Sequence, residues 1–193
     1  INWCHREKSL YFCPMKIDVI PYASAIRSDL IKNRHVVVID VLRASSVMIT
    51  ALENGAKAFI PVSTVEEARQ KADILQGEEI LLCGERDTKI IDGFHLGNSP
   101  QTYTRDKVED KTLIFTSSNG TQALKRLQEA EEVFIGSFLN INALMHRFLM
   151  LDNAVLVCSG TNNNFSMDDA MCAALFMDEI IKKKTVRLSD LSI

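Results

Sequence analysis

Seven short runs of apolar, often β-branched residues recur along the chain, and most of the gaps between them show helical periodicity. The strand-like runs lie at 16–20, 35–41, 57–62, 79–83, 112–116, 132–136 and 154–158. The helical patterns lie at 45–54, 65–75, 121–129, 141–149 and 167–184. Strands that alternate with helices predict βαβ units. We therefore predict an α/β protein with three layers, α/β/α, around a largely parallel sheet whose ligand site lies at the carboxyl ends of the strands.

Charged residues at the helix ends support these assignments. Glu66 and Glu67 fall in the first turn of the helix predicted over 65–75, after a Ser-Thr cap. The last predicted helix has Asp168 and Asp169 in its first turn and three lysines in its last. Both arrangements complement the helix dipole, so they predict where the helices begin and end.

The segment 84–111 departs from this alternation. About 16 of its residues are too polar and too rich in glycine to suggest a helix or a strand. Long irregular segments in compact domains are usually functional. We therefore expect this segment to contribute to the ligand site.

Composition excludes several classes of protein. The 193 residues are 47% apolar and 24% charged, with a net charge of −3 and a pI near 5.8. A nucleic-acid binder is expected to be distinctly basic. No apolar run approaches the ~20 residues that a membrane helix needs. We expect a protein of the cytoplasm that binds neither nucleic acid nor membrane; whether it forms a homo-oligomer stays open.

The five cysteines are scattered, and none forms a C-x-x-C pair. This pattern indicates reduced thiols and not a disulfide framework or a zinc site. Cys83 and Cys158 lie inside apolar strands and are predicted to be core residues. Any metal chemistry is expected to use hard oxygen ligands.

The two ends of the chain suggest its boundaries. Met15 directly precedes the first strand-like run. We therefore expect residues 1–14 to be a non-native or disordered extension, and residues 15–193 to form the α/β domain.

Polar residues follow nearly every predicted strand. They are Asp40, Arg43, Ser45, Ser46, Glu85, Arg86, Ser117, Ser118, Asn119, Gly120, Thr121, Ser137, Asn140, Ser159, Gly160 and Thr161, with Asp168 and Asp169 soon after. In one parallel sheet the carboxyl ends of the strands share an edge. The sequence therefore predicts a cleft for a small, strongly anionic ligand, with carboxylates beside it that suit a hard metal ion.

Each of these elements also has a structural explanation. The 117–121 segment contains an Asn-Gly turn and a helix cap, although its small residues also suit an anion site at a helix start. Arg43 and Arg86 are either partners of Asp40 and Glu85 or ligands of a phosphate or carboxylate, which arginine grips through two N–H groups. The two acidic residues at 168 and 169 are either helix-terminal charges or part of the site.

Carboxylates beside arginines and hydroxyls suit phosphate ester chemistry. Mg²⁺ is held by one or two carboxylates, water and phosphate oxygens. The chain has no G-x-x-x-x-G-K-[ST] motif and no G-x-G-x-x-G after a strand, which excludes a P-loop and leaves a dinucleotide site unsupported. Leu42 stands where the haloacid dehalogenase superfamily has a second Asp, which argues against that superfamily.

Several segments, in this order, resemble the 2-phosphosulfolactate phosphatase family. They are Val38–Ala44, Ala51–Ala56, Gly84–Arg86, Gly93–Pro100, Ser118–Thr121, Gly136–Asn140, Val157–Thr161 and Phe165–Asp169. The resemblance covers about residues 15–193, and the Gly-Phe-x-Leu-Gly-Asn-Ser-Pro block is its most specific part. His95 departs from the Asp more usual in the family, Ser45-Ser46 from Thr-Thr, and Asp168 from Glu. Family members are longer, which implies that this chain is truncated at its C-terminus.

The resemblance implies a Mg²⁺-dependent phosphatase that converts (R)-2-phospho-3-sulfolactate to 3-sulfolactate and phosphate, a step of coenzyme M biosynthesis. Many bacteria without coenzyme M carry homologues, so two alternatives stay open. One is a phosphatase for another small phosphorylated 2-hydroxy acid, and the other is a non-catalytic anion-binding domain.

We assign roles to the candidate residues as follows. The catalytic candidates are Asp40, Arg43, Glu85, Arg86 and Asp169, of which Asp40, Glu85 and Asp169 are the predicted Mg²⁺ ligands. The predicted substrate-binding residues are Asn98, Ser99, Ser118, Asn119, Gly120, Thr121, Ser137, Asn140, Gly160 and Thr161. A rival role for Asp40 is that of a nucleophile that forms an aspartyl-phosphate.

Overall fold

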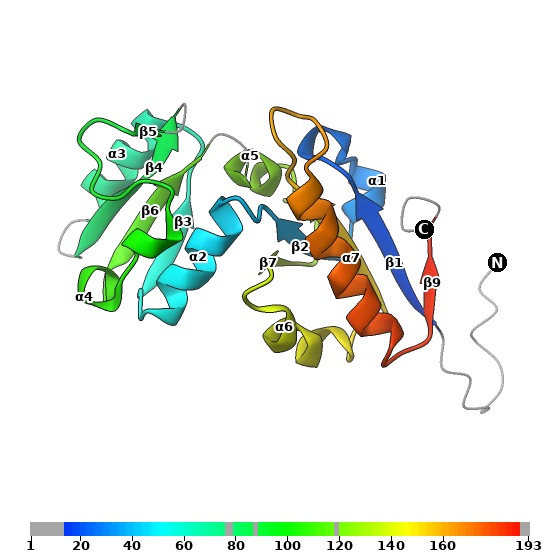
Figure 1. Ribbon diagram of the computed structural model, residues 1–193. Helices are drawn as coiled ribbons and strands as arrows, with labels where there is room; N and C mark the ends of the chain where they lie inside the picture. The colour runs from blue at the N-terminus through cyan, green and yellow to red at the C-terminus, as the bar shows by residue number, and fades with distance from the viewer. Residues whose placement is uncertain (1–13, 76–78, 87–88, 118–119, 190–193) are drawn as a thin grey trace.

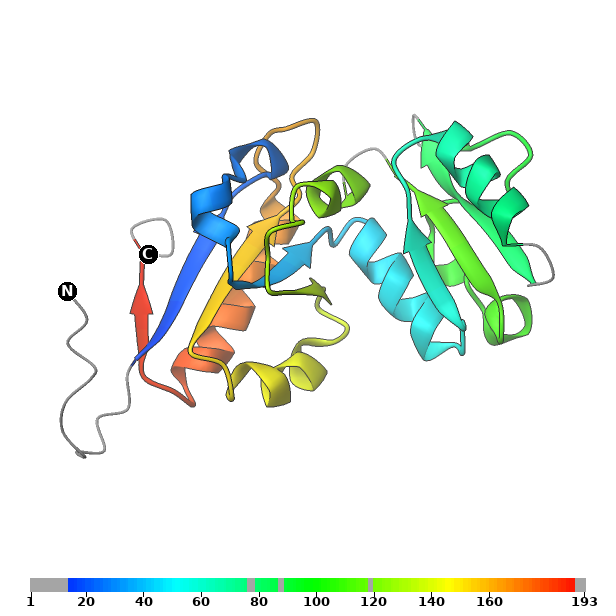
Figure 2. The same ribbon diagram turned by 180° about the vertical axis from the view of Figure 1, so that it is seen from behind.

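The computed structural model describes residues 14–75, 79–86, 89–117 and 120–189, and in them the strands form two separate sheets (Figures 1 and 2). The first sheet, in the order β7-β2-β8-β1-β9, contains β1 (Met15–Ile20), β2 (His35–Ile39), β7 (Glu132–Gly136), β8 (Asn153–Cys158) and β9 (Val186–Leu188). The second, in the order β3-β6-β4-β5, contains β3 (Ala58–Pro61), β4 (Ile80–Arg86), β5 (Lys89–Ile90) and β6 (Thr112–Thr116). The helical elements are η1 (Ala23–Ala25), α1 (Ser28–Ile31), α2 (Ala44–Glu53), α3 (Val65–Ile74), η2 (Pro100–Thr102), α4 (Arg105–Val108), α5 (Gly120–Lys125), α6 (Ile141–Phe148) and α7 (Met167–Ile181).

The predicted α/β class is confirmed, but the strands do not form the single sheet that the sequence interpretation assumes. All the strand pairs are parallel except β4 with β5. The chain leaves the first sheet through α2, which connects β2 to β3, and returns through α5, which connects β6 to β7. The strand ends predicted to share one edge are therefore divided between two sheets that lie side by side (Figure 1).

Helices cover both faces of the first sheet, which explains why its central strand β2 is apolar throughout. Val37 and Ile39 pack in the core beneath α6 and α7, while Val36 and Val38 pack in the core beneath α1 and α5. Successive side chains of a strand point to opposite faces, so both sets become buried. This is the pattern from which the strand is predicted.

The second sheet also lies between two helical layers. One face packs against α2 and α4 through a core that includes Val47, Tyr103 and Phe115. The other face packs against α3 through a core that includes Ala68 and Ile114. Helix α2 therefore belongs to the packing of the second sheet, although it starts directly at the end of a strand of the first.

All seven predicted strands and all five predicted helices are present, with small shifts at their ends. The segment 84–111 is more regular than predicted: β4 extends to Arg86, and β5, η2 and α4 follow. Cys83 and Cys158 are buried in the core, as predicted. The predicted 1–14 extension lies, except for Pro14, outside the described residues. No helix in the described part of the chain is long and apolar enough to cross a membrane.

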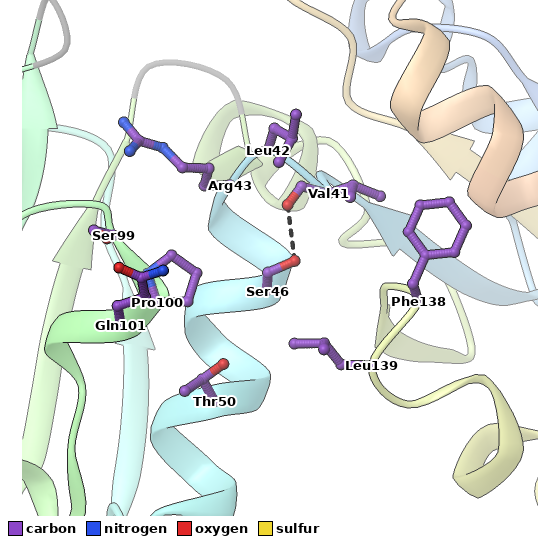
Figure 3. Close-up of a pocket in the computed structure, with 10 residues that line it drawn as sticks. All are labelled: Val41, Leu42, Arg43, Ser46, Thr50, Ser99, Pro100, Gln101, Phe138 and Leu139. Carbon is purple, nitrogen blue, oxygen red and sulfur yellow. Dashed lines mark hydrogen bonds between the residues drawn. The ribbon is translucent and has the colours of Figure 1, made fainter.

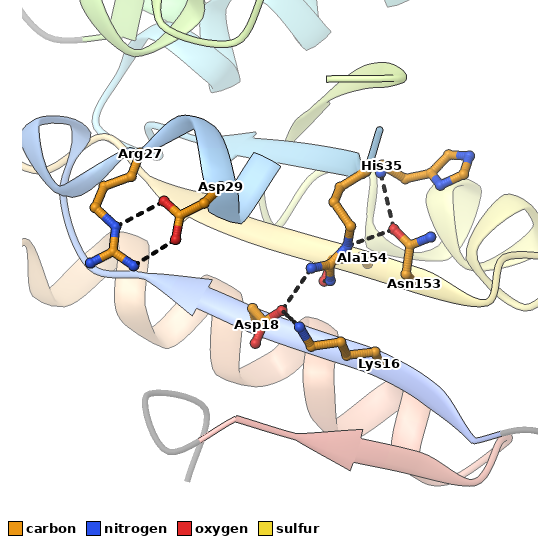
Figure 4. Close-up of polar contacts among 8 residues, drawn as sticks. Lys16, Asp18, Arg27, Asp29, His35, Asn153 and Ala154 are labelled. Atoms are coloured by element: carbon orange, nitrogen blue, oxygen red, sulfur yellow. Dashed lines mark hydrogen bonds and ion pairs between the residues drawn. The ribbon is translucent and has the colours of Figure 1, made fainter. Parts of the chain in front are cut away.

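At the edge where the strands of the first sheet begin, a buried carboxylate has a full set of cationic partners (Figure 4). Arg34 donates to Asp18 Oδ2 at 2.9 Å and to Asn153 Oδ1 at 2.9 Å, and Lys16 lies 3.1 Å from the same Asp18 oxygen. Burial by itself raises the pKa of Asp18, but the hydrogen bonds from Arg34 and Lys16 hold it below its usual value. Asp18 is therefore a buried carboxylate whose negative charge is offset by two cationic side chains.

Candidate functional site

Asp40 occupies the turn between the carboxyl end of β2 and the first residue of α2. Its carboxylate Oδ1 accepts a hydrogen bond from the backbone N–H of Ala44 at 3.1 Å, and its own N–H donates to Ser45 Oγ at 2.9 Å. Only 7% of Asp40 is exposed. The turn thus holds a buried carboxylate at the strand end, where open α/β sheets place their ligands.

The first turn of α7 brings two more carboxylates to the same place. Asp169, 2% exposed, accepts hydrogen bonds from the backbone N–H groups of Val41 at 2.8 Å and Gly160 at 3.0 Å. Asp168 accepts from the backbone N–H of Leu42 at 3.1 Å and from the Ser166 hydroxyl. Helix α7 therefore contacts two consecutive amides that follow Asp40.

The pKa values of Asp40 and Asp169 are both raised, chiefly by burial. Burial, together with the negative charge of Asp169, raises the pKa of Asp40 to about 7. Burial also raises the pKa of Asp169 to about 6, against the effect of its hydrogen bonds from Val41 and Gly160. Unlike Asp18 at the opposite edge, neither has a cationic partner among the described residues. This end of the sheet has a deficit of positive charge that a bound cation would offset.

Gly120, at the start of α5, approaches this turn more closely than any residue with a side chain could. A Cβ atom at Gly120 would lie 2.7 Å from Asp40 Oδ2 and 2.8 Å from Ala44 Cβ. Gly120 follows β6 of the second sheet, whereas Asp40 follows β2 of the first. The structure thus unites two predicted site residues from different sheets. The neighbouring Ser118 and Asn119 lie outside the described residues.

A surface groove of about 610 Å³ lies next to the same turn (Figure 3). It is lined by Val41, Leu42, Arg43, Ser46, Thr50, Ser99, Pro100, Gln101, Phe138 and Leu139. Arg43 extends from the start of α2 toward the second sheet, and Phe138 and Leu139 lie on the other side of α2 (Figure 3). The groove therefore brings together two predicted residues, Arg43 and Ser99, in mostly apolar surroundings.

The two predicted arginines differ in their contacts. Arg43 is half-buried, and within the described part of the chain its guanidinium has no hydrogen-bond or ion-pair partner, Asp40 included. Arg86 donates to the backbone oxygens of Glu85 at 2.8 Å and Ser63 at 3.2 Å, and to Thr116 Oγ1 at 2.9 Å. The sequence interpretation favours substrate binding over a structural role for both arginines, but the bonds of Arg86 tie the ends of the three parallel strands of the second sheet.

Several predicted substrate-binding residues make local hydrogen bonds. Ser137 N–H donates to Asn140 Oδ1 at 3.0 Å, and Asn140 Nδ2 donates to the carbonyl of Ile135 at 2.9 Å. Thr121 Oγ1 donates to the carbonyl of Ser117 at 2.9 Å. These contacts stabilise the turns before α5 and α6. Two other predicted residues differ in their burial. Asn98 Oδ1 is buried and has no partner in the described part of the molecule, whereas Thr161 is exposed.

The three predicted Mg²⁺ ligands do not form one group in the structure. Asp40 follows β2 of the first sheet and Asp169 lies in α7, which covers that sheet, whereas Glu85, which is buried, belongs to β4 of the second. Among the described residues, no three His, Cys, Asp or Glu side chains are arranged to hold a metal ion. The chemistry of the site nevertheless fits Mg²⁺, because this ion needs only one or two carboxylates when water and phosphate complete its shell. Asp40 is the buried carboxylate with the strongest need for a cation.

Three residues of this site are among the polar residues that follow the predicted strands, but the sequence interpretation assigns them no role. Asp168 bonds the Leu42 amide, Ser45 bonds the Asp40 amide, and Ser159 has a buried hydroxyl without a partner among the residues described. Their positions directly after strands or at a helix start are the signal that could have identified them. Each also has an ordinary explanation as a cap or a helix charge.

The fold and this site define an α/β protein with buried carboxylates and a groove at the carboxyl ends of its strands. The family model for 2-phosphosulpholactate phosphatase matches residues 21–193. Curated relatives called "Probable 2-phosphosulfolactate phosphatase" include one from Clostridium novyi, 45% identical over 93% of this chain and 76% of its own length. Another, from Clostridium perfringens strain SM101, is 48% identical over 92% of this chain and 73% of its own. A third, from Caldanaerobacter subterraneus, is 46% identical over 84% and 68%.

The chain belongs to the 2-phosphosulfolactate phosphatase family. Enzymes of this kind are phosphoric monoester hydrolases. The resemblance inferred from the sequence segments is therefore confirmed.

Proposed function

We propose that this protein is a Mg²⁺-dependent phosphatase that hydrolyses (R)-2-phospho-3-sulfolactate to 3-sulfolactate and phosphate. The observation that carries the proposal is the buried Asp40 carboxylate, which has acidic neighbours and no cationic partner among the described residues. Its relatives' names supply the substrate. In methanogens this reaction would belong to coenzyme M biosynthesis.

In the proposed site Asp40 is the first ligand of Mg²⁺, and Glu85 is the next candidate. When bound, the ion supplies Lewis-acid catalysis and activates water. Arg43, whose guanidinium has no partner among the described residues, binds an anionic group of the substrate. Gly120 keeps space beside Asp40 Oδ2, since a side chain there would overlap the carboxylate. The P–O bond to the substrate's C2 breaks, the water oxygen ends on phosphate, and the leaving oxygen takes up a proton.

The test is phosphate release from (R)-2-phospho-3-sulfolactate by the purified protein, with and without EDTA. Phosphate release that EDTA stops and added Mg²⁺ restores is the expected result. Release at background in the presence of Mg²⁺ would contradict the proposal and leave the two alternatives, a phosphatase for another phosphorylated 2-hydroxy acid and a non-catalytic anion-binding domain. A single turnover followed by borohydride reduction separates direct attack by water from an aspartyl-phosphate, because only the acyl-phosphate is reduced, which converts the Asp40 side chain to an alcohol.

The lining of the groove favours a second candidate substrate class. Leu42 is 72% exposed and Leu139 is 62% exposed, so the surroundings of Arg43 are more apolar than a sulfonate requires. A phosphorylated 2-hydroxy acid without a sulfonate would suit such surroundings. Comparing kcat/KM for phospholactate and phosphosulfolactate decides between the two, since equal values would contradict recognition of the sulfonate.

Replacing Arg43 with Lys should damage catalysis with little effect on stability. Lysine cannot reproduce the two-pronged contact with an oxyanion, and losing it should lower kcat/KM by roughly 30- to 150-fold. Because Arg43 has no partner among the described residues, the melting temperature should stay nearly unchanged. Arg86→Lys is the matched control: it breaks bonds to Ser63 and Thr116 and should lower the melting temperature. A fall in stability for Arg43→Lys without a kinetic effect would contradict the assignment.

A further inference from the structure

Both carboxylate oxygens of Asp169 accept hydrogen bonds from backbone N–H groups in two neighbouring turns. Oδ1 accepts from Val41 N–H at 2.8 Å, and Oδ2 accepts from Gly160 N–H at 3.0 Å. Val41 lies in the turn between β2 and α2, and Gly160 lies in the turn after β8. Asp169 itself is 2% exposed. One buried side chain therefore joins the ends of two adjacent strands of the first sheet.

Asp168 extends this arrangement by one residue. Its Oδ2 accepts from Leu42 N–H at 3.1 Å, while its other oxygen accepts from the Ser166 hydroxyl. Val41 and Leu42 are the two residues that separate Asp40 from Arg43. Both amides between the proposed metal ligand and the proposed anion-binding arginine are thus fixed by the first turn of α7.

We propose that Asp169, assisted by Asp168, is a positioning residue that sets the direction of Asp40 and Arg43, and is not itself a Mg²⁺ ligand. The sequence interpretation places Asp169 among the ligands. In the structure both oxygens of Asp169 instead accept hydrogen bonds from the backbone. A carboxylate suits this role because each of its two oxygens is an acceptor. Without Asp169, the two N–H groups that donate to it would be buried without partners, which costs free energy of folding.

The substitution Asp169→Asn tests the proposal, because it replaces one carboxylate oxygen by an NH₂ group and changes little else. In Asp169→Asn one oxygen still accepts, but the amide nitrogen is a donor and would face the N–H of either Val41 or Gly160. The turn must then shift on one side. A displacement of about 1 Å at a catalytic group costs roughly 100-fold in rate, so kcat should fall by about that factor while KM changes little.

The decisive measurement compares Mg²⁺ binding in Asp169→Asn and Asp40→Asn by calorimetry, without substrate. Asp169→Asn only shifts the turn and is expected to weaken Mg²⁺ binding less than Asp40→Asn, which removes a ligand and should weaken binding at least about tenfold. Equal weakening by both substitutions would overturn the proposal, because it would make Asp169 a ligand. Asp178→Asn, which alters an exposed ion pair with Lys182 on the same helix, is the control and should change neither value.

A purely structural role predicts a different pattern. In that case Asp169→Asn would lower the melting temperature and leave kcat of the folded fraction at the wild-type value, which would also overturn the proposal. If Asp169→Asn does not fold, Asp168→Asn serves instead, since it loses only the contacts to Leu42 and Ser166, and its kcat should fall with Mg²⁺ binding unchanged. The kinetic part rests on the proposed function. If the wild type releases no phosphate, that function fails, and Mg²⁺ binding together with hydrogen exchange at the Val41 and Gly160 amides still decides the role of Asp169.

Discussion

Asp40→Asn should abolish phosphate release. At the same time it should make the stability of the metal-free protein less dependent on pH between about pH 5 and about pH 8. The loss of activity is expected to be about 1,000-fold, which corresponds to roughly 4 kcal/mol of transition-state stabilisation supplied through the metal. The gain in stability has the same origin, since the substitution removes a buried charge beside Asp168 and Asp169. The measurements are a phosphate-release assay and thermal unfolding in EDTA.

The sign of the pH effect follows from the raised pKa of Asp40. Between its unfolded value of 3.8 and its folded value of about 7, the folded protein holds a proton that the unfolded chain has released. The free energy of unfolding therefore falls as pH rises through this range. From about pH 5 to about pH 8 the wild type should lose on the order of 2 kcal/mol more than Asp40→Asn.

Magnesium provides the control for this explanation. A cation bound to the ionised carboxylate should restore the stability of the wild type at about pH 8, and it should have little effect on Asp40→Asn. Identical pH profiles for the two metal-free proteins would contradict the unpaired charge at Asp40. Full activity of Asp40→Asn at low Mg²⁺ would contradict its role as a ligand.

The elements of the fold are predictable because their signals are local. The run from 35 to 41 is apolar on both faces, and this pattern alone indicates a strand covered on both sides. The Ser-Thr cap before Val65 and the acidic start at Asp168 mark helix ends with neighbouring residues. These signals need no knowledge of what the element packs against.

The division into two sheets depends on partners far apart in the sequence, so the sequence pattern does not predict it. β2 pairs with β7 and β8, whereas β3, which follows it directly, pairs with β6. All of these strands are short apolar runs, and nothing in their composition distinguishes one sheet from the other. The assumption of one common edge therefore groups Glu85 and Arg86 with Asp40, although they belong to the other sheet.

The candidate site shows the same limit. Asp40 and Arg43 are predictable because they directly follow a strand, and Gly120 because it lies in a small-residue turn before a helix. The contacts of Asp168 and Asp169 with the Val41–Leu42 amides span more than 120 residues. Acidic residues at a helix start already have a local explanation in the helix dipole, so the sequence leaves open whether they also belong to the site and does not reveal which amides they bind.

Gly120→Ala is expected to impair both catalysis and folding, because the new methyl group would have to occupy space held by Asp40 and Ala44. The distances of 2.7 Å to Asp40 Oδ2 and 2.8 Å to Ala44 Cβ are both too short for a carbon atom. The carboxylate is itself held by the Ala44 N–H, so it cannot move without breaking that bond. Overpacking of this kind costs about 1–3 kcal/mol of stability, and the displaced carboxylate should lower kcat/KM by roughly 100-fold.

Two further variants separate this explanation from a general effect of alanine at a glycine. At Gly97 a Cβ would lie 3.7 Å from Ile90 Cβ, an ordinary contact, so Gly97→Ala should keep both its melting temperature and its kcat/KM. Adding Ala44→Gly to Gly120→Ala removes one of the two overlapping groups and should recover part of the lost activity. If Gly120→Ala alone has the kcat/KM of the wild type, the start of α5 does not need to approach Asp40 for catalysis. If it loses stability but keeps kcat in the folded fraction, the close approach serves packing between the two sheets and not the chemistry at Asp40.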